Sequence, residues 1–229
     1  MTAIVAIIPA YNEANRIRPV IEATRAHLPV LVVDDGSSDS TAQIAEQAGA
    51  EVLRQVPNQG KGAALRAGFR HALAQGMDAV ITLDADGQHA PDEIPRFLEA
   101  YTRTRADLII GARQFRYMPT VRRISNTLGT WLFSWALGQS IPDNQSGYRL
   151  MSRRLMEAVL ESQEQGFEFE VEMITTCIVR GYRLEWVPIS TIYAGESSHI
   201  QPAKHLVNFL RVTWQARQTV RQGRTSTTG

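Results

Sequence analysis

The chain has 229 residues, 44% of them hydrophobic and 21% charged, which is the composition of a globular protein with room for a large core. Its single cysteine, Cys177, excludes an internal disulfide framework and fits a reducing compartment. No stretch reaches the roughly 18 apolar residues that span a bilayer, and the apolar start Ile4–Ile8 is too short for a secretory signal. We therefore expect a cytoplasmic protein without a transmembrane segment, either free or attached peripherally to the cytoplasmic face of a membrane.

The first half of the chain alternates between continuously apolar strand patterns and helical patterns. Strands are predicted at Ile4–Ile8, Val30–Val33, Val52–Arg54, Ala79–Leu83 and Asp107–Ile110. Helices are predicted at Asn12–His27, after a capping box of Ser40 and Gln43, at Gly62–Gln75 and at Pro91–Thr104. Because buried strands alternate with helices, the pattern predicts an α/β fold with a mainly parallel sheet sandwiched by helices.

The second half of the chain is less regular. Helices are predicted at Ile124–Leu137, at Ser152–Leu160 and from about His205 onward, with a glycine-containing turn at Asp143–Tyr148 and a strand at Trp186–Ile189. Cys177 lies in the apolar run Met173–Val179, which favours a buried thiol over a nucleophile. The polar residues 223–229 are expected to be a disordered tail.

Polar side chains follow four of the predicted strands at the point where each strand ends: Tyr11-Asn12-Glu13, Asp34-Asp35, Asp84-Ala85-Asp86 and Arg113. Parallel strands bring their carboxyl ends to one edge of a sheet, where open sheets bind ligands. In an extended segment Asp84 and Asp86 would point the same way, and two adjacent carboxylates favour a divalent cation between them. Magnesium completes such a site with substrate phosphates. The alternative is turn chemistry, because Asp86-Gly87 is also a turn signal.

The ordered set of motifs resembles family 2 inverting glycosyltransferases of the A-type fold, specifically the dolichyl- or polyprenyl-phosphate sugar synthases. The resemblance covers about residues 4–200 and is carried by Ile8-Pro9-Ala10-Tyr11-Asn12-Glu13, Val32-Val33-Asp34-Asp35-Gly36-Ser37-Ser38-Asp39, Asn58-Gln59-Gly60-Lys61-Gly62, Asp84-Ala85-Asp86-Gly87-Gln88, Gly111-Ala112-Arg113 and Asp143-Asn144-Gln145-Ser146-Gly147-Tyr148-Arg149. It implies a Rossmann-like nucleotide-binding fold. Residues 1–200 would be the catalytic domain, with a nucleotide-sugar half (1–112) and an acceptor half (113–200), followed by a basic helix (201–222).

The resemblance also assigns the donor and metal residues. It implies that the nucleotide base and ribose are held by Pro9, Tyr11, Glu13, Val33 and Asp35. The donor site would extend over Lys61, Asp84 and Ala85, with a purely structural role as the alternative for Lys61. Asp86 and Gln88 match the ligands of Mg²⁺ or Mn²⁺, and Asp84 would connect the metal to the donor. His89 is interpreted as a neighbour of the next helix rather than a ligand.

The acceptor residues follow from the same resemblance. Arg113 matches an arginine beside the sugar diphosphate, and the acceptor phosphate would be received by Arg113, Arg122, Arg123, Ser125 and Ser146. Arg149 belongs to the second active-site segment. Asp143 is a general base if the acceptor is a hydroxyl, and otherwise orients Arg149 or another neighbour. The usual late Arg-x-x-Gly-x-Ser-Lys pattern is missing from Tyr193–His199, so Lys204 is expected to replace the lost charge.

The implied reaction is metal-dependent transfer of a sugar from a UDP- or GDP-linked donor to polyprenyl or dolichyl phosphate. A hydroxyl acceptor and a catalytically silent membrane-docking module are the alternatives. Residues 203–229 carry basic and no acidic side chains, and Leu128, Trp131 and Trp135 form an apolar stripe that suits either a bilayer interface or the core. We expect no nucleic-acid partner and leave a homo-oligomer or a membrane-protein partner open.

Overall fold

A computed structural model describes residues 2–113, 120–161, 168–190, 211, 213–218 and 220, without the side chains of 120–126. The strands are β1 (Ile4–Ala10), β2 (Val30–Asp35), β3 (Glu51–Gln55), β4 (Ala79–Thr82), β5 (Leu108–Arg113), β6 (Arg149–Ser152) and β7 (Leu184–Ile189). The helices are α1 (Ile17–Arg25), α2 (Thr41–Gln47), α3 (Lys61–Ala74), α4 (Ile94–Thr104), α5 (Thr120–Leu137), α6 (Arg153–Val159) and α7 (Glu168–Val179). A short 3₁₀ helix, η1 (Pro91–Glu93), leads into α4.

The described strands form one sheet in the order β3-β2-β1-β4-β6-β5-β7. Strand β6 runs antiparallel to both of its neighbours, β4 and β5, whereas all other neighbouring pairs are parallel. The predicted α/β fold with a mainly parallel sheet is therefore confirmed. Because β6 runs the opposite way, the residues just before it arrive at the edge where β1, β2, β4 and β5 end. The sequence analysis did not predict this four-residue strand, which stands between the predicted turn and the predicted helix.

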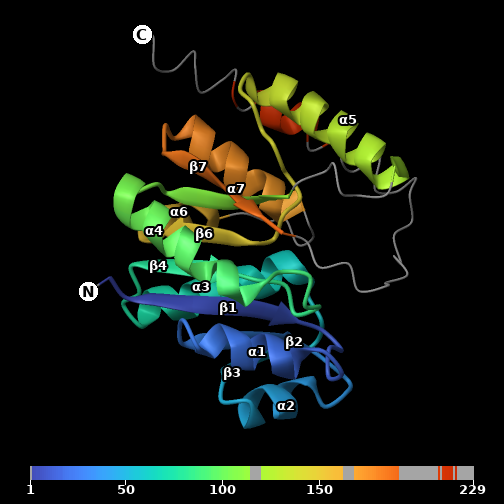
Figure 1. Ribbon diagram of the computed structural model, residues 1–229, viewed down its shortest axis with the longest axis vertical. Coiled ribbons are helices and arrows are strands. Elements are labelled where there is room, and N and C mark those ends of the chain that lie inside the picture. Colours follow the sequence, from blue (N-terminus) through green and yellow to red (C-terminus); the bar gives the residue numbers. More distant parts are fainter. Residues whose placement is uncertain are drawn as a thin grey trace.

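Alternation along the strands builds a core on each face of the sheet (Figure 1). In β1, Val5 and Ile7 pack with residues of α3, α6 and α7, such as Phe69, on one face. Ala6 and Ile8 pack on the other face with residues of α1, α2 and α4. Helices thus cover both faces, as parallel buried strands require.

Several predicted boundaries are corrected by local backbone chemistry. The helix predicted from Asn12 begins only at Ile17, where α1 starts. Asn12 itself has a left-handed φ of 56°, which places it in the turn after β1 rather than in a helix. The predicted capping box is wrong, since the Ser40 side chain makes no capping hydrogen bond. Asp39 takes this role instead: its Oδ1 accepts a hydrogen bond from the Thr41 amide at 2.9 Å.

Helix α7 was not predicted, although its second half is the apolar run that contains Cys177. The thiol is fully buried in the core and burial raises its pKa to about 12, which confirms a packing residue rather than a nucleophile. The predicted strand Trp186–Ile189 is found within β7. The predicted C-terminal helix is seen as helical backbone at residues 211, 213–218 and 220, and the predicted tail lies outside the described residues. None of the described helices is both long and apolar enough to cross a membrane.

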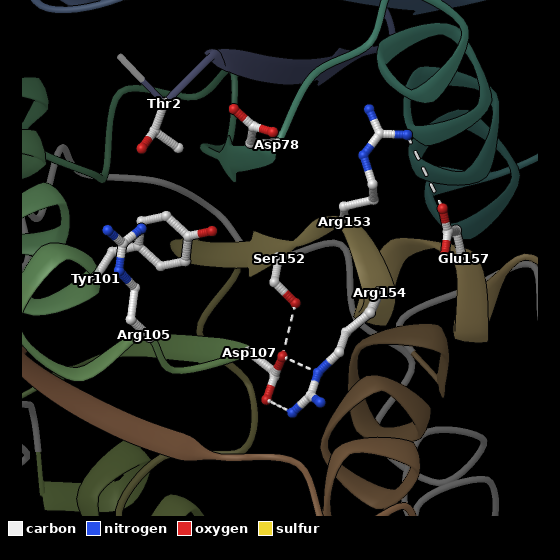
Figure 2. A pocket seen from close by; sticks show the side chains of 9 residues that line it. All are labelled: Thr2, Asp78, Tyr101, Arg105, Asp107, Ser152, Arg153, Arg154 and Glu157. Carbon is white, nitrogen blue, oxygen red and sulfur yellow. Dashed lines mark hydrogen bonds and ion pairs between the residues drawn. The ribbon is translucent and has the colours of Figure 1, made fainter.

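Asp107 ties together three elements at the edge of the sheet where the parallel strands begin (Figure 2). Its buried carboxylate accepts hydrogen bonds from Arg154 Nε and Nη2, both at 2.5 Å, and from Ser152 Oγ at 2.9 Å. The Arg183 amide donates a further hydrogen bond at 2.9 Å. Burial by itself would raise the pKa of Asp107, but these donors outweigh it and hold the pKa below its usual value of 3.8.

We predict that Asp107→Asn lowers the free energy of unfolding by about 1–3 kcal/mol near neutral pH, because a neutral amide replaces the buried carboxylate that accepts the hydrogen bonds of Ser152, Arg154 and Arg183. Because folding lowers the pKa of Asp107, its ionised carboxylate stabilises the folded protein at pH values above the ordinary pKa of 3.8. This contribution disappears as the pH falls through the folded-state pKa. Urea unfolding at pH 7 and at a series of pH values from about 4 down to about 2 checks both points. Asp92→Asn, at a side chain 94% exposed, is the matched control. Equal stability of wild type and Asp107→Asn at pH 7 would contradict the assignment.

Candidate functional site

A pocket of about 380 Å³ opens where β1 and β2 end, beside the residues that follow β4. It is lined by Pro9, Ala10, Tyr11, Glu13, Asp35, Asn58, Gly60, Lys61, Ala64, Asp84, Ala85 and Asp86. This set contains every residue that the family resemblance assigned to the donor except Val33, which is buried within the sheet. Two larger hollows, of about 840 and 590 Å³, contain none of the predicted site residues. Because the predicted donor residues line the smallest of these three hollows, we take it as the candidate site.

Asp35 forms part of the pocket wall and also shapes the loop opposite. Its carboxylate accepts hydrogen bonds from the amides of Gln59 at 2.9 Å and Gly60 at 2.7 Å. Gly60 has a φ of 90°, a conformation that glycine adopts without strain, and α3 begins at the next residue. The Asp35 side chain thus places the start of α3, and with it Lys61, against the pocket.

The Asp84–Gln88 segment differs from the extended geometry expected for it. Strand β4 ends at Thr82, and Gly87 has a φ of 78° in the turn that follows. Asp86 Oδ1 accepts a hydrogen bond from the backbone amide of Gln88 at 2.9 Å, which holds these two residues close together. Asp84 and Asp86 still line the same pocket, so a turn rather than a strand presents the two carboxylates.

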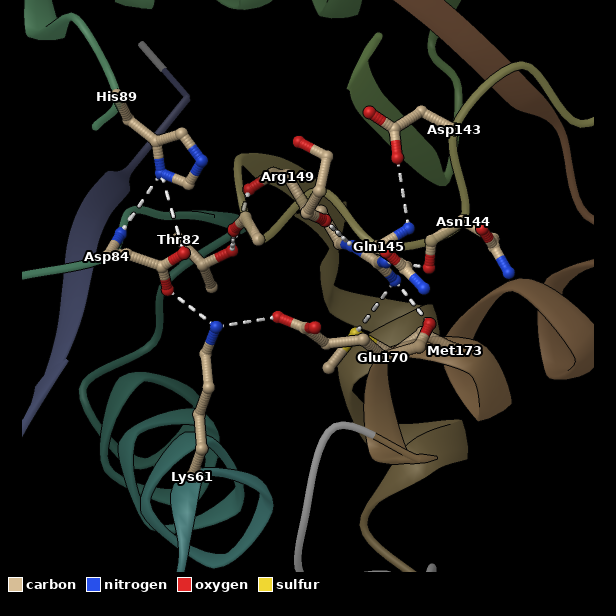
Figure 3. A network of polar contacts seen from close by, with 12 residues as sticks. Lys61, Thr82, Asp84, His89, Asp143, Asn144, Gln145, Arg149, Glu170 and Met173 are labelled. Carbon is tan, nitrogen blue, oxygen red and sulfur yellow. Dashed lines mark hydrogen bonds and ion pairs between the residues drawn. The ribbon is translucent and has the colours of Figure 1, made fainter. Parts of the chain in front are cut away.

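Lys61 lies between two carboxylates from different parts of the chain (Figure 3). Its Nζ is 2.5 Å from Asp84 Oδ1 and 2.9 Å from Glu170 Oε1. Burial opposes the charge of the lysine, but the two carboxylates overcome it and raise the pKa of Lys61. Burial likewise opposes ionisation of Asp84, and the nearby Lys61 ammonium outweighs it and lowers the pKa of Asp84. Both groups are charged at neutral pH.

Glu170 is the site residue that sequence reasoning missed. It stands in the first turn of α7 and is 5% exposed. The sequence signal was the pair Glu168 and Glu170, which alternate with apolar residues in Phe167–Val171, since buried acids are rare without a partner. Helix α7 itself had not been predicted, so this signal had no place in the expected fold.

His89 is buried beside Asp84 and stacks near Tyr148, with ring centroids 5.1 Å apart. Its Nδ1 accepts a hydrogen bond from the Asp84 amide at 3.2 Å and lies 3.9 Å from Asp84 Oδ2. Burial lowers the pKa of His89, which keeps the ring neutral. These contacts make it a support for the turn that carries Asp84.

Arg113 and Asp143 form a two-pronged ion pair at the end of β5. Arg113 Nε lies 2.6 Å from Asp143 Oδ2, and Nη2 donates to Oδ1 at 2.9 Å. The Asp143 side chain is fully buried. The residue that Asp143 orients is therefore Arg113 and not Arg149. A carboxylate held in this way is poorly placed to accept a proton from a substrate.

Arg149 is 1% exposed, and its guanidinium donates hydrogen bonds to backbone carbonyls. Nε donates to Ser146 O at 2.7 Å, Nη2 donates to Asn144 O at 3.3 Å, and Nη1 donates to Glu170 O. The structure therefore places Arg149 as a support that joins the 143–148 loop to α7, out of reach of a ligand. Ser146 is also 1% exposed, and its Oγ has no hydrogen-bond partner among the described residues.

The remaining acceptor residues cannot be placed. The side chains of Arg122, Arg123 and Ser125 lie outside the described residues, as do Lys204 and the segment 191–200 that departs from the family pattern.

The pocket residues suit a hard divalent cation bound together with a diphosphate. Within the described part of the chain, no three His, Cys, Asp or Glu side chains gather as a complete metal cage. Mg²⁺ needs only one or two protein carboxylates when phosphates and water supply the other ligands. Asp84 and Asp86 bring two carboxylates to the pocket, and the backbone amide of Gln88 donates to Asp86 Oδ1, which keeps Gln88 beside it in the chain. The donor set fits such an ion.

Comparison with known proteins agrees with the pocket and its motifs. Residues 5–160 match the model of the family described as "Glycosyl transferase family 2". The chain belongs to glycosyl transferase family 2. The described fold and this match identify a glycosyltransferase, as the sequence predicted.

The relatives include enzymes named for lipid-phosphate acceptors. The chain is 36% identical over 204 residues to the undecaprenyl-phosphate mannosyltransferase of Micrococcus luteus, covering 82% of this chain and 83% of that one. It is 31% identical over 218 residues to the UDP-N-acetylglucosamine–dolichyl-phosphate N-acetylglucosaminyltransferase of Methanococcus voltae, covering 83% of this chain and 86% of that one. The resemblance to polyprenyl-phosphate sugar synthases is thereby confirmed.

The fold is also that of a solved glycosyltransferase. The UDP complex of glucosyl-3-phosphoglycerate synthase from Mycobacterium tuberculosis superposes with a TM-score of 0.75 at 21% identity, covering 95% of this chain and 80% of that one. A further structure of the same synthase contains Mn²⁺ with UDP. The likeness confirms the A-type fold for this family 2 glycosyltransferase.

Gly147 permits the close approach of the 143–148 loop to the ion pair at the pocket. A Cβ at this position would lie 2.7 Å from Asp84 Oδ2 and 3.0 Å from Lys61 Nζ. We predict that Gly147→Ala displaces this pair and lowers glycosyl transfer by about 10- to 100-fold with little loss of thermal stability. Transfer rates and thermal unfolding check this.

Gly181→Ala is the matched control for this substitution. Gly181 has a φ of 66° and open space around it, so an alanine there costs stability through backbone strain without touching the site. The explanation is wrong if Gly147→Ala transfers sugar at the wild-type rate, or if Gly181→Ala loses as much activity.

Proposed function

We propose that this glycosyltransferase moves a sugar from a nucleoside-diphosphate donor, linked to UDP or GDP, to polyprenyl phosphate in a metal-dependent, inverting reaction. The observation that carries the proposal is the convergence of Asp84, Asp86 and Lys61 on one pocket, with the Arg113–Asp143 pair at the same edge of the sheet. The named acceptors of the relatives support the lipid phosphate.

The donor nucleotide would lie along the ends of β1 and β2. Tyr11 is half exposed at the pocket and offers a ring face to a base, while Glu13 and Asp35 offer carboxylates to ribose hydroxyls. Carboxylates that accept hydrogen bonds from ribose hydroxyls are a recurrent device of nucleotide-binding sheets. Pro9 and Ala85 complete the wall, and Val33 supports it from within the sheet.

The diphosphate would lie at the Asp84–Gln88 turn. Asp86 and Gln88 would hold Mg²⁺ or Mn²⁺, with Asp84 as the connection to the donor. When bound, such an ion neutralises the charge that develops on a departing nucleoside diphosphate. Lys61 already keeps Asp84 ionised and in place, so this part of the site is charged before any ligand enters.

The acceptor phosphate would approach from the side of Arg113. A guanidinium suits a phosphate because it offers donors in a planar fork. Its pairing with Asp143 fixes the fork at the end of β5. Arg122, Arg123, Ser125 and Lys204 are proposed as further contacts to the acceptor, and Ser146 as a residue of the loop beside it.

The engagement of Asp143 favours a phosphate over a hydroxyl as the nucleophile. A hydroxyl acceptor needs a general base, whereas Asp143 is buried and bound to Arg113 through both oxygens. An acceptor phosphate is largely ionised at neutral pH, because its second pKa is about 6. The enzyme then mainly aligns the phosphate for attack on the anomeric carbon and stabilises the leaving group.

We predict that Mn²⁺ together with UDP or GDP raises the unfolding temperature of the wild type, and that Asp86→Ala abolishes the metal-dependent part of this shift. Transfer to polyprenyl phosphate should fall by about 100-fold in the same variant, because one ligand of the diphosphate-bound ion is lost. A thermal-shift screen with and without Mn²⁺, followed by a radiolabelled transfer assay, makes both measurements.

Asp78→Ala is the control, since Asp78 accepts a hydrogen bond from the Ala3 amide at the opposite edge of the sheet. An unchanged metal-dependent shift in Asp86→Ala would refute the ligand assignment. Turnover with a hydroxyl acceptor and none with polyprenyl phosphate would refute the acceptor. The absence of nucleoside-diphosphate binding under all conditions would favour a catalytically silent module.

A further inference from the structure

Glu93 is a buried acid that the proposed function does not use. It is the last residue of η1, the 3₁₀ helix that follows the Asp84–Gln88 turn, and it is 7% exposed. Its two carboxylate oxygens accept the Ser190 amide at 3.1 and 3.3 Å. Arg96 Nη1 donates to the same carboxylate at 3.4 Å and to Pro188 O at 3.3 Å. A buried carboxylate is costly unless its oxygens are engaged, and here the donors come from α4 and from the end of β7.

The contact between Glu93 and Ser190 joins two strand ends that are not neighbours in the sheet. Glu93 follows β4 in the chain, whereas Ser190 comes directly after β7. Strands β6 and β5 lie between β4 and β7. Ile189 is in register with Arg113 at the end of β5, so Ser190 is the next residue beyond that pair. The Glu93 carboxylate therefore connects the segment after β4 to the strand ends beside Arg113.

The chain between the Asp84–Gln88 turn and Glu93 is held at each step. His89 Nδ1 accepts a hydrogen bond from the Asp84 amide at 3.2 Å (Figure 3). Ala90 O accepts hydrogen bonds from the Glu93 amide at 3.1 Å and from Tyr148 Oη at 3.2 Å. The Tyr148 ring also packs against the ring of His89, as described above. Because these contacts follow one another closely along the chain, a displacement of η1 would displace the turn with it.

We propose that Glu93 is a positioning residue that holds the Asp84–Gln88 turn in place relative to Arg113. This inference rests on the proposed function, because the turn is proposed to hold the metal and Arg113 to bind the acceptor phosphate. Glu93 is not among the residues that line the pocket, so it acts through the Ser190 amide and through η1. A misplacement of about 1 Å far from the reacting atoms can cost 100-fold in rate, which makes such a support important for transfer.

The competing explanation is that Glu93 only satisfies a buried amide and stabilises the fold. Removal of its side chain would then lower stability and leave the geometry of the turn unchanged. The two explanations are separated by measurements at the turn itself, made on the full chain with variants that lose stability elsewhere as controls.

Amide hydrogen exchange of the ligand-free protein tests the connection without donor, metal or acceptor. Glu93→Ala should speed the exchange of the Asp84 and Gln88 amides by about tenfold or more, because the turn loses its anchor and opens locally. Glu93→Gln keeps an oxygen for the Ser190 amide and should exchange at nearly the wild-type rate. Glu99→Ala, the same substitution on the exposed surface of α4, is the matched control. Unchanged exchange at Asp84 and Gln88 in Glu93→Ala would overturn the proposal.

A titration with Mn²⁺ in the presence of UDP or GDP, followed by thermal unfolding, measures the consequence for the site. The Mn²⁺ concentration that gives half of the shift should rise about tenfold or more in Glu93→Ala, which is typical when a support of metal ligands is lost. It should stay near the wild-type value in Glu93→Gln and in Asp107→Asn, which we expect to be destabilised at the opposite edge of the sheet. An equal rise in Asp107→Asn would show that lost stability alone explains the effect, and would overturn the proposal.

The positioning role and the proposed function can fail separately. If neither nucleoside diphosphate with Mn²⁺ shifts the wild type, the proposed donor site is wrong, and hydrogen exchange still decides whether Glu93 holds the turn. Glu93→Asp is the milder variant if Glu93→Ala does not fold, because it withdraws the carboxylate from Ser190 by one methylene. Faster exchange at the turn in Glu93→Asp would support the proposal, and wild-type exchange there would overturn it.

Discussion

The Lys61 ammonium between Asp84 and Glu170 is the contact on which the site depends, because it joins three separate parts of the chain at one partly buried point. Asp84 follows the central strand, Lys61 begins a helix, and Glu170 stands in the first turn of α7. Both carboxylates lie within ion-pair distance of the one ammonium, so Lys61 gives each of them a positively charged partner. The arrangement holds a charged carboxylate at the pocket before a ligand arrives, which is the preorganisation that charge-stabilising sites use.

Arg149 joins separate backbone segments in the same way that Lys61 joins separate side chains. Its guanidinium binds carbonyls of the 143–148 loop and the carbonyl of Glu170, so one buried cation fixes both the loop and α7. The loop can reach this place only because β6 is antiparallel between β4 and β5. A strand reversal in the middle of the sheet thereby delivers the Asp143–Arg113 pair to the edge that carries the candidate pocket.

Periodicity alone was enough to predict the strands of the first half and the helices between them, because buried parallel strands and amphipathic helices leave distinct patterns. The residues at the strand ends could also be placed together in advance, since all parallel strands end at one edge. The short strand β6 and helix α7 were out of reach. Four residues carry too little pattern, and α7 is apolar around most of its surface, so its period is weak.

The sequence by itself determined the fold class, the family and most residues of the candidate pocket, because these depend on local patterns and on motifs that stay contiguous in the chain. Only the tertiary structure decided which charges meet. Asp143 pairs with Arg113 rather than Arg149, Glu170 completes the Lys61 contact, and Arg217 lies over the Trp135 ring of α5. Each of these contacts links residues distant in sequence, and their choice of partner depends on distances that only the folded chain sets.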